Sequence, residues 1–367
     1  MKRLPLLVLA TSLVFSIACG GTAVDLDRPA SLDGAAGNPA VESMQIGKID
    51  RVLGADGSRV YWDADPTIGS DVRGCAFDRC ADSLLSYFDV QTTGSLAVAP
   101  DELFFSAGLG AAGVETASNN VLSCPKTGCS DGPETFVQDP DSGDLRQLFT
   151  VDTQALYWAS EFDIYRCPLA GCGEVPERVA SRLDGDQNVG ATPQTYSRTS
   201  ALLVAGDSVY WRAQANVDAA VFWAAKDGSG TAKRLATVSL GDFGFAVDDR
   251  RLYWLDDSNQ IVSCVLSECG DSAPTPLVAT GAPKSWLQVD ERGLYWLQTD
   301  SYPEPTLVSL RFCPLSGCAA GTEPASLASN HVRSYVLSPS YVYWDESISD
   351  TVIVDTGLIY RMPKPAK

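Results

Sequence analysis

Cysteine is the residue type whose spacing in this sequence most clearly indicates chemistry. Ten of the eleven cysteines form five pairs, each with four residues between the partners. This spacing lets two thiols meet across a tight turn within disulfide-bonding distance. Structural zinc sites need two such pairs together or added histidines, and redox-active dithiols usually have two intervening residues. We therefore predict five structural disulfides in an oxidising location: Cys75–Cys80, Cys124–Cys129, Cys167–Cys172, Cys264–Cys269 and Cys313–Cys318.

Two groups of aspartates could supply oxygen ligands to calcium. They are Asp63, Asp65 and Asp71, and Asp139, Asp141 and Asp144. Neither group has the glycine and glutamate that a calcium loop needs at its sixth and twelfth positions. A Ser-His-Asp triad or a multi-histidine metal centre would rest on the single histidine, His331. We predict no catalytic residue, no metal site and no cofactor, and a calcium-dependent hydrolase, lactonase or lyase is the alternative.

A repeated aromatic pair defines the elements that must position these residues. The pair follows a leucine or β-branched residue, and apolar runs around it are cut by Gly, Pro, Asp and Ser. Recurrence at roughly 40–50 residues is typical of β-propeller blades. We predict an all-β, seven-bladed β-propeller of four-stranded antiparallel blades over residues 41–367. The pairs are Tyr61-Trp62, Phe104-Phe105, Tyr157-Trp158, Tyr210-Trp211, Tyr253-Trp254, Tyr295-Trp296 and Tyr343-Trp344.

The third repeat shows how one blade is expected to form. Its predicted strands are Leu148–Val151, Ala155–Trp158, Ile164–Cys167 and Cys172–Val179. Because side chains alternate along a strand, Leu156 and Trp158 should face one neighbouring blade and Tyr157 the other. A buried tryptophan removes about 200 Å² from water, so the aromatic pairs are interpreted as packing residues and not as a sugar platform.

Aspartates precede the predicted turn between the first two strands of several blades. They are Asp152, Asp248 and Asp290. An aspartate at such a position accepts a hydrogen bond from the backbone two residues later. We therefore interpret these carboxylates as turn formers and not as catalytic groups.

The two ends of the predicted propeller should complete one blade together. The last repeat contains strands at Ser334–Leu337, Tyr341–Trp344 and Gly357–Met362, and the sequence then ends without a fourth. The segment Val41–Lys48 can supply the missing outer strand. Such a pairing closes the ring and leaves no open edge between the first and last blades.

The N-terminal residues resemble a bacterial lipoprotein leader. Residues 1–18 combine Lys2 and Arg3 with an apolar run, and the unpaired Cys19 follows Ala18. We predict a signal peptide over 1–18, lipidation at Cys19 and a flexible tether over 19–40. Ordinary signal-peptidase cleavage after Ala18 is the other reading. The prediction is an exported protein anchored to the cell envelope, at the outer membrane or the cell surface, through its lipid only.

Net charge excludes one class of partner. The formal charge is -19 at pH 7. Such a surface repels phosphate backbones, so nucleic-acid binding is not expected.

We expect a monomer.

The phrase Asp248-Asp-Arg-Arg-Leu-Tyr-Trp254, with Lys226-Asp-Gly-Ser-Gly230 before it, resembles the YWTD-type propellers of lipoprotein-receptor ectodomains and their bacterial relatives. The resemblance covers the repeats but is specific only at the Tyr-Trp pair and the turn. It implies a propeller fold and a binding role. This sequence departs from that family because threonine never follows the tryptophan and because seven copies are present instead of six.

Loop length indicates where a ligand is expected to bind. Connections between second and third strands, and between blades, vary in length and fall on one face of the predicted disc, whereas the other connections are short. Variable loops on a rigid scaffold commonly carry binding residues. We predict a non-catalytic propeller that binds an envelope or extracellular protein or glycan through this long-loop face. The candidate binding residues are Tyr196, Arg212, Tyr302, Asp345 and Glu346.

Overall fold

The computed structural model describes residues 40–46, 49–64, 71–89, 96–106, 120–129, 131–138, 149–160, 163–173, 175–181, 196–215, 219–238, 244–270, 272–279, 283–299, 308–316, 324–328, 331–347 and 355–365. These residues belong to one compact unit, Pro39–Lys367. The predicted leader, Cys19 and nearly all of the predicted tether lie outside the described residues.

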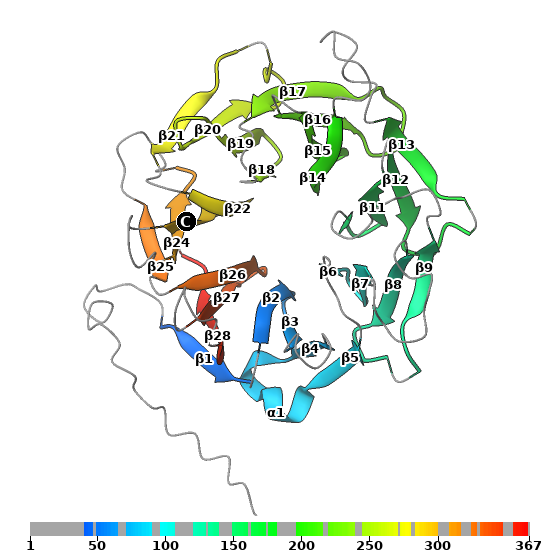
Figure 1. Ribbon diagram of the computed structural model, residues 1–367, viewed down its shortest axis with the longest axis vertical. Coiled ribbons are helices and arrows are strands. Elements are labelled where there is room, and N and C mark those ends of the chain that lie inside the picture. Colours follow the sequence, from blue (N-terminus) through cyan, green and yellow to red (C-terminus); the bar gives the residue numbers. More distant parts are fainter. Residues whose placement is uncertain are drawn as a thin grey trace, which may run out of the picture. The chain divides into compact units, whose positions relative to one another are not determined.

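Seven four-stranded antiparallel sheets form a ring, which is a seven-bladed β-propeller, as predicted (Figure 1). Blade 1 contains β2 (Ile49–Ala55), β3 (Val60–Ala64), β4 (Asp71–Cys75) and β5 (Leu85–Asp89). Blade 2 contains β6 (Leu96–Val98), β7 (Glu102–Ser106), β8 (Asn120–Pro125) and β9 (Glu134–Gln138). Blade 3 contains β10 (Phe149–Val151), β11 (Ala155–Ala159), β12 (Asp163–Pro168) and β13 (Glu177–Ser181).

The remaining blades repeat this order from the centre of the ring outwards. Blade 4 contains β14 (Tyr196–Ala205), β15 (Ser208–Ala215), β16 (Ala219–Ala225) and β17 (Lys233–Val238). Blade 5 contains β18 (Phe245–Val247), β19 (Arg251–Leu255), β20 (Gln260–Val265) and β21 (Thr275–Ala279). Blade 6 contains β22 (Pro283–Val289), β23 (Gly293–Thr299), β24 (Val308–Pro314) and β25 (Ala325–Ala328). Blade 7 contains β26 (Val332–Leu337), β27 (Tyr341–Ser347), β28 (Asp355–Pro363) and β1 (Glu42–Gln45).

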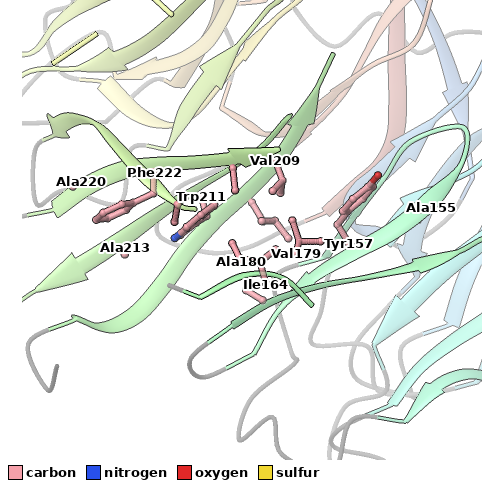
Figure 2. Close-up of a cluster of buried hydrophobic side chains, with 14 residues drawn as sticks. Ala155, Tyr157, Ile164, Val179, Ala180, Val209, Trp211, Ala213, Ala220 and Phe222 are labelled. Carbon is pink, nitrogen blue, oxygen red and sulfur yellow. The ribbon is translucent and has the colours of Figure 1, made fainter. Parts of the chain in front are cut away.

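The hydrophobic core is divided among the interfaces between blades, which we call seams and number by the two blades that meet. Seven clusters of buried side chains occupy the seven seams of the described structure. At seam 2/3, Leu156 and Trp158 pack against Phe104 of blade 2. At seam 3/4, Tyr157 joins a cluster with Trp211 and Phe222 of blade 4 (Figure 2). The prediction that Leu156 and Trp158 face one neighbouring blade and Tyr157 the other is therefore confirmed.

The second aromatic residue of every pair is buried. Its exposed fraction is 0% at Trp158 and Trp211 and reaches 5% only at Trp254. Rings also stack within blades, as Trp211 does on Phe222 with ring centroids 5.9 Å apart. These residues wedge neighbouring blades together, and the prediction that they serve packing is confirmed.

Four of the predicted disulfides are present: Cys75–Cys80, Cys124–Cys129, Cys167–Cys172 and Cys264–Cys269, with Cα atoms 4.9–5.7 Å apart. Cys313 is likewise disulfide-bonded, and its predicted partner Cys318 lies outside the described residues. Ala224 and Met362, which replace the first cysteine in blades 4 and 7, are also buried. The slot is therefore apolar and enclosed whether or not it carries sulfur.

The second cysteine of blade 3 lies outside the strand that was predicted to begin with it. The sequence indicated that the outer strand of blade 3 begins at Cys172, but β13 begins at Glu177. The disulfide therefore closes the connection between the third and fourth strands and does not join paired strand residues. In blade 1 this connection is helical, with a 3-10 turn at Phe77–Arg79 (η1) and a short helix at Cys80–Ser83 (α1).

The N-terminal strand completes the last blade, as predicted, although β1 is shorter than the predicted segment Val41–Lys48. It pairs antiparallel with β28, with Glu42 opposite Arg361 and Gln45 opposite Leu358. Arg361 binds both Glu42, at 2.8 Å, and Asp78 of η1. Its guanidinium also lies over the rings of Phe77 and Tyr341, 4.2 and 4.6 Å from their centroids. One side chain therefore joins the first strand, blade 1 and blade 7.

Replacing one seam tryptophan should destabilise the ring far more than replacing a tryptophan outside the seam core. We expect Trp211→Ala to lower the free energy of unfolding by about 3–5 kcal/mol, because it leaves a cavity between blades 3 and 4. Trp223→Ala in the same blade is the matched control, since Trp223 is only partly buried. Urea unfolding followed by tryptophan fluorescence measures both. Equal effects of the two substitutions would contradict the packing role.

Candidate functional site

The short connections of all blades lie on one face, which we call the short-turn face. It contains the turns between first and second strands and the connections between third and fourth strands. Asp152 Oδ1 accepts hydrogen bonds from the backbone N–H groups of Gln154 and Ala155, at 2.7 and 2.8 Å. Asp248 and Asp290 hold their turns in the same way. The predicted role as turn formers is confirmed, and Asp56 of blade 1 is a fourth example.

In three of these four aspartates, the second oxygen has a further role, because it binds a lysine of the next blade. Lys126 Nζ donates to Asp56 Oδ2 at 2.7 Å across seam 1/2. Lys226 Nζ donates to Asp152 Oδ2 at 3.0 Å across seam 3/4, and Lys364 pairs with Asp290 across seam 6/7. All three lysines occupy the same slot, two residues after the first cysteine position of their blades. We call these three interfaces charged seams.

Two other interfaces are apolar at the same place. At seam 2/3 the turn residue is Ala99 and the slot across the seam holds Leu169, and both belong to one hydrophobic cluster. At seam 4/5 the corresponding residues are Ala205 and Leu266, again in one cluster. An aspartate therefore meets a lysine and an alanine meets a leucine. Seam 5/6 combines the two types, because its turn residue is Asp248 and the equivalent slot of blade 6 holds Leu315, which is 37% exposed.

The ion pairs shift the acidity of the groups around them. Burial raises the pKa of Asp56, but hydrogen bonds from Lys126, Ser58 and Arg59 outweigh it and hold the pKa at about 2. The pKa of Asp152 is lowered in the same way, since the turn amides and Lys226 outweigh burial. Burial, followed by the nearby Asp152 carboxylate, raises the pKa of Tyr157 to about 12. Both aspartates are therefore ionised at neutral pH.

A cavity of about 490 Å³ opens on the short-turn face among blades 1 to 4. The first-strand turns of these blades surround it, so it lies near the inner end of the sheets. Asp56, Lys126, Asp152 and Lys226 are its charged lining residues. Its other lining residues are Val98, Ala99, Pro100, Val151, Thr153, Val204, Ala205 and Gly206. A concave site that combines apolar walls with a few fixed polar groups is a common form of ligand site.

Two of the predicted binding residues are buried inside blades. Arg212 is 1% exposed and lies in β15, while Asp345 is 0% exposed and lies in β27. Asp345 accepts hydrogen bonds from Arg333 Nε at 2.8 Å, from the backbone N–H of Val52 and from Ser334. Burial raises the pKa of this carboxyl group, although Arg333 and Ser334 partly oppose the shift. The geometry gives Asp345 a structural role at seam 7/1.

The other three candidates are not brought together with these two in one described site. Glu346 is half-buried and accepts a hydrogen bond from the indole N–H of Trp344 at 2.9 Å. Tyr196 begins β14, where it pairs with Ala215. Tyr302 lies outside the described residues. Contact of any of the five with a ligand stays a prediction.

The described residues do not form a calcium site. Asp63 lies in β3 and is 1% exposed, whereas Asp65, Asp139, Asp141 and Asp144 lie outside the described part. Among the residues that the structure describes, no three His, Cys, Asp or Glu side chains gather as a metal site would require. Calcium binding stays untested.

Sequence reasoning missed the lysines of the charged seams. The signal that could have found them is a correlation between repeats. Three of the four blades with a turn aspartate are followed by a blade with a lysine in this slot, and Asp248, followed by Leu315, is the exception. This correlation appears only when each blade is compared with its neighbour.

Solved structures with the same fold are distant in sequence. YCF48 from Cyanidioschyzon merolae matches with a TM-score of 0.55 and 10% identity, covering 88% of this chain and 98% of that one. The WD40 propeller domain of Doa1 matches with a TM-score of 0.52 and 12% identity over 90% and 98% of the two chains. PorZ, a bacterial surface component of the type-IX secretion system of Porphyromonas gingivalis, matches with a TM-score of 0.50 and 12% identity over 89% and 39%.

These similarities show the propeller fold alone. No protein-family model matches the sequence, and no curated protein sequence does. The resemblance to YWTD-type propellers is therefore supported only at the level of the fold, and the seven blades differ from the six of that family. In the described part of the chain, no helix has the length and apolar character that crossing a membrane requires.

Supplying the missing cation at seam 5/6 should stabilise the protein. We expect Leu315→Lys to raise the free energy of unfolding by about 0.5–1 kcal/mol through a new ion pair with Asp248. Leu315→Gln is the control for loss of the leucine side chain. Urea unfolding at low and high salt measures the gain, which should disappear in an Asp248→Asn background. A gain of the same size without Asp248 would contradict the seam pairing.

Acid should remove the stabilisation that Asp56 provides. Because the folded pKa is lowered from 3.8 to about 2, this contribution is complete above about pH 4 and is lost as the pH falls towards 2. We expect Asp56→Asn to cost about 1–2 kcal/mol at pH 6 and almost nothing at pH 2. Urea midpoints of both proteins between pH 6 and pH 2 test this. A difference that does not change with pH would contradict the ion pair.

Proposed function

We propose that this protein is a non-catalytic binding protein of the bacterial cell envelope, anchored by lipid at Cys19, which binds a protein or glycan partner through its long-loop face. The observation that carries the proposal is that the charged side chains which could take part in catalysis serve instead as structural contacts. The turn aspartates, the lysines across the seams and the Asp345–Arg333 pair all hold blades together. Such a protein acts as a rigid support for binding loops.

The position of β1 supports an N-terminal anchor. This strand begins at Glu42, forms the outer edge of blade 7 and is fixed there by Arg361. A chain that runs from an anchor would therefore enter the propeller at its rim and leave the centre of both faces accessible. PorZ, which shares the fold, is described as a bacterial surface component, and a surface location is our proposal for this chain as well.

Binding by the long-loop face is supported by the stiffness of the ring beneath it. A closed ring of packed blades fixes the strand ends from which these connections start, and a fixed support lowers the ordering cost of binding. Arg212 and Asp345 lie buried in β15 and β27, shortly before two of these connections, so we propose that they position loop residues and that Tyr196, Tyr302 and Glu346 are the contact candidates. We propose that the protein acts as a monomer.

The anchor is tested by lipid labelling. We expect the wild-type chain, expressed in bacteria with an alkyne-tagged fatty acid, to become labelled and to remain in the membrane fraction after a high-salt wash. Cys19→Ala should be unlabelled and released, with an unchanged unfolding midpoint. Unlabelled wild-type protein with its N-terminus at Cys19 would show ordinary signal-peptidase cleavage and contradict the proposed anchor.

The binding face is tested by comparing variants of the two faces. We expect Tyr302→Ala to reduce binding to purified envelope proteins or glycans at least tenfold, because aromatic side chains often dominate binding energy. Val175→Ala is the control, because Val175 is 76% exposed and lies on the short-turn face. Binding that is lost in Val175→Ala and kept in Tyr302→Ala would place the partner on the opposite face.

A further inference from the structure

Three consecutive seams line the cavity on the short-turn face, and they differ in chemical character. Seam 1/2 contributes the Asp56–Lys126 pair, seam 2/3 contributes Ala99, and seam 3/4 contributes the Asp152–Lys226 pair. Two ammonium groups therefore flank an apolar segment of the wall. The volume, about 490 Å³, lies within the usual range for sites that bind small organic molecules.

Counting hydrogen bonds shows which groups at this cavity can still bind a ligand. Asp56 Oδ1 accepts from Ser58 N, Ser58 Oγ and Arg59 N, and its Oδ2 accepts from Lys126 and Tyr61. Asp152 likewise accepts two bonds at each oxygen. Both carboxylates have their acceptor positions filled, since a carboxylate offers about four lone-pair sites.

The two lysines, in contrast to the carboxylates, have hydrogen-bonding capacity left. An ammonium group has three N–H donors. Within the described residues, Lys126 Nζ donates only to Asp56 and Lys226 Nζ only to Asp152. Each side chain is partly exposed, at 16% for Lys126 and 19% for Lys226, and each lines the cavity. At seams 1/2 and 3/4, the cavity therefore presents unused N–H donors of lysine and no unused acceptors of these two carboxylates.

We propose that this cavity binds a small organic molecule with an apolar chain and a carboxylate at each end. Each carboxylate accepts hydrogen bonds from one of the two lysines, and the chain crosses the apolar wall at Ala99. The net negative charge of the protein weakens long-range attraction of such a ligand, but screening at physiological salt confines this effect to about 8 Å. The site is on the opposite face from the proposed partner and does not depend on it.

The test uses suberate, an eight-carbon dicarboxylate, titrated into the purified full-length chain in detergent by calorimetry. The double substitution Asp56→Ala with Lys126→Leu gives seam 1/2 the residues that seams 2/3 and 4/5 already have. Asp152→Ala with Lys226→Leu does the same at seam 3/4. Asp290→Ala with Lys364→Leu is the matched control, because it removes an equivalent ion pair that does not line the cavity.

We expect suberate to bind the wild type and the control equally, and each of the other two double variants about tenfold more weakly, as loss of one charge-assisted contact predicts. Octane-1,8-diamine, of similar length but opposite charge, should not bind. If a double variant fails to fold, Lys126→Gln or Lys226→Gln, which keeps a donor to the aspartate, should give the same loss. The proposal is overturned if suberate does not bind at millimolar concentration, if the control loses binding equally, or if the diamine binds as well.

Discussion

Packing between blades is the interaction on which this structure depends. A single four-stranded blade has two faces that both carry apolar side chains, and only its neighbours can cover them. The seven buried clusters each lie between two blades, and no cluster belongs to one blade alone. The ring must therefore close, because an open end would expose residues such as Trp62 or Tyr343 to water.

Closure requires contacts between residues from opposite ends of the chain. At seam 7/1 these contacts include ion pairs and hydrogen bonds in addition to the apolar cluster. In the outer strands of blade 7, Arg361 joins Glu42 and Asp78. In the innermost strand, Arg333 donates to Asp345 and to the carbonyl of Ile49 at 2.8 Å. Buried charges are stabilising only when their partners are in place. These bonds therefore favour one alignment of the first and last blades, which apolar contacts alone would fix less strictly.

Sequence reasoning identified what repeats along the chain and missed what connects neighbouring repeats. The period of the aromatic pairs gave the blade number, and the cysteine spacing gave four disulfides that the structure contains. Arg212 and Asp345 were interpreted as loop residues because they follow the tryptophan, but β15 and β27 continue past them to Ala215 and Ser347. A charge at such a position looks solvent-exposed in the sequence, although the paired strand encloses it. The seam lysines were missed because their partners lie about 70 residues earlier in the chain.

A blade that lies between a charged and an apolar seam has two sides that differ. Blade 2 presents Lys126 to blade 1 and Ala99 to blade 3. If its gene segment were duplicated in tandem, the lysine of the second copy would meet the alanine of the first, and a cation would be left without a counter-charge in a confined space. Growth of the ring by copying one unit is thus disfavoured, whereas copying blades 2 and 3 as a pair would place Asp152 opposite the new Lys126. Duplication of that pair would therefore preserve the alternation of charged and apolar seams that runs from seam 1/2 to seam 4/5.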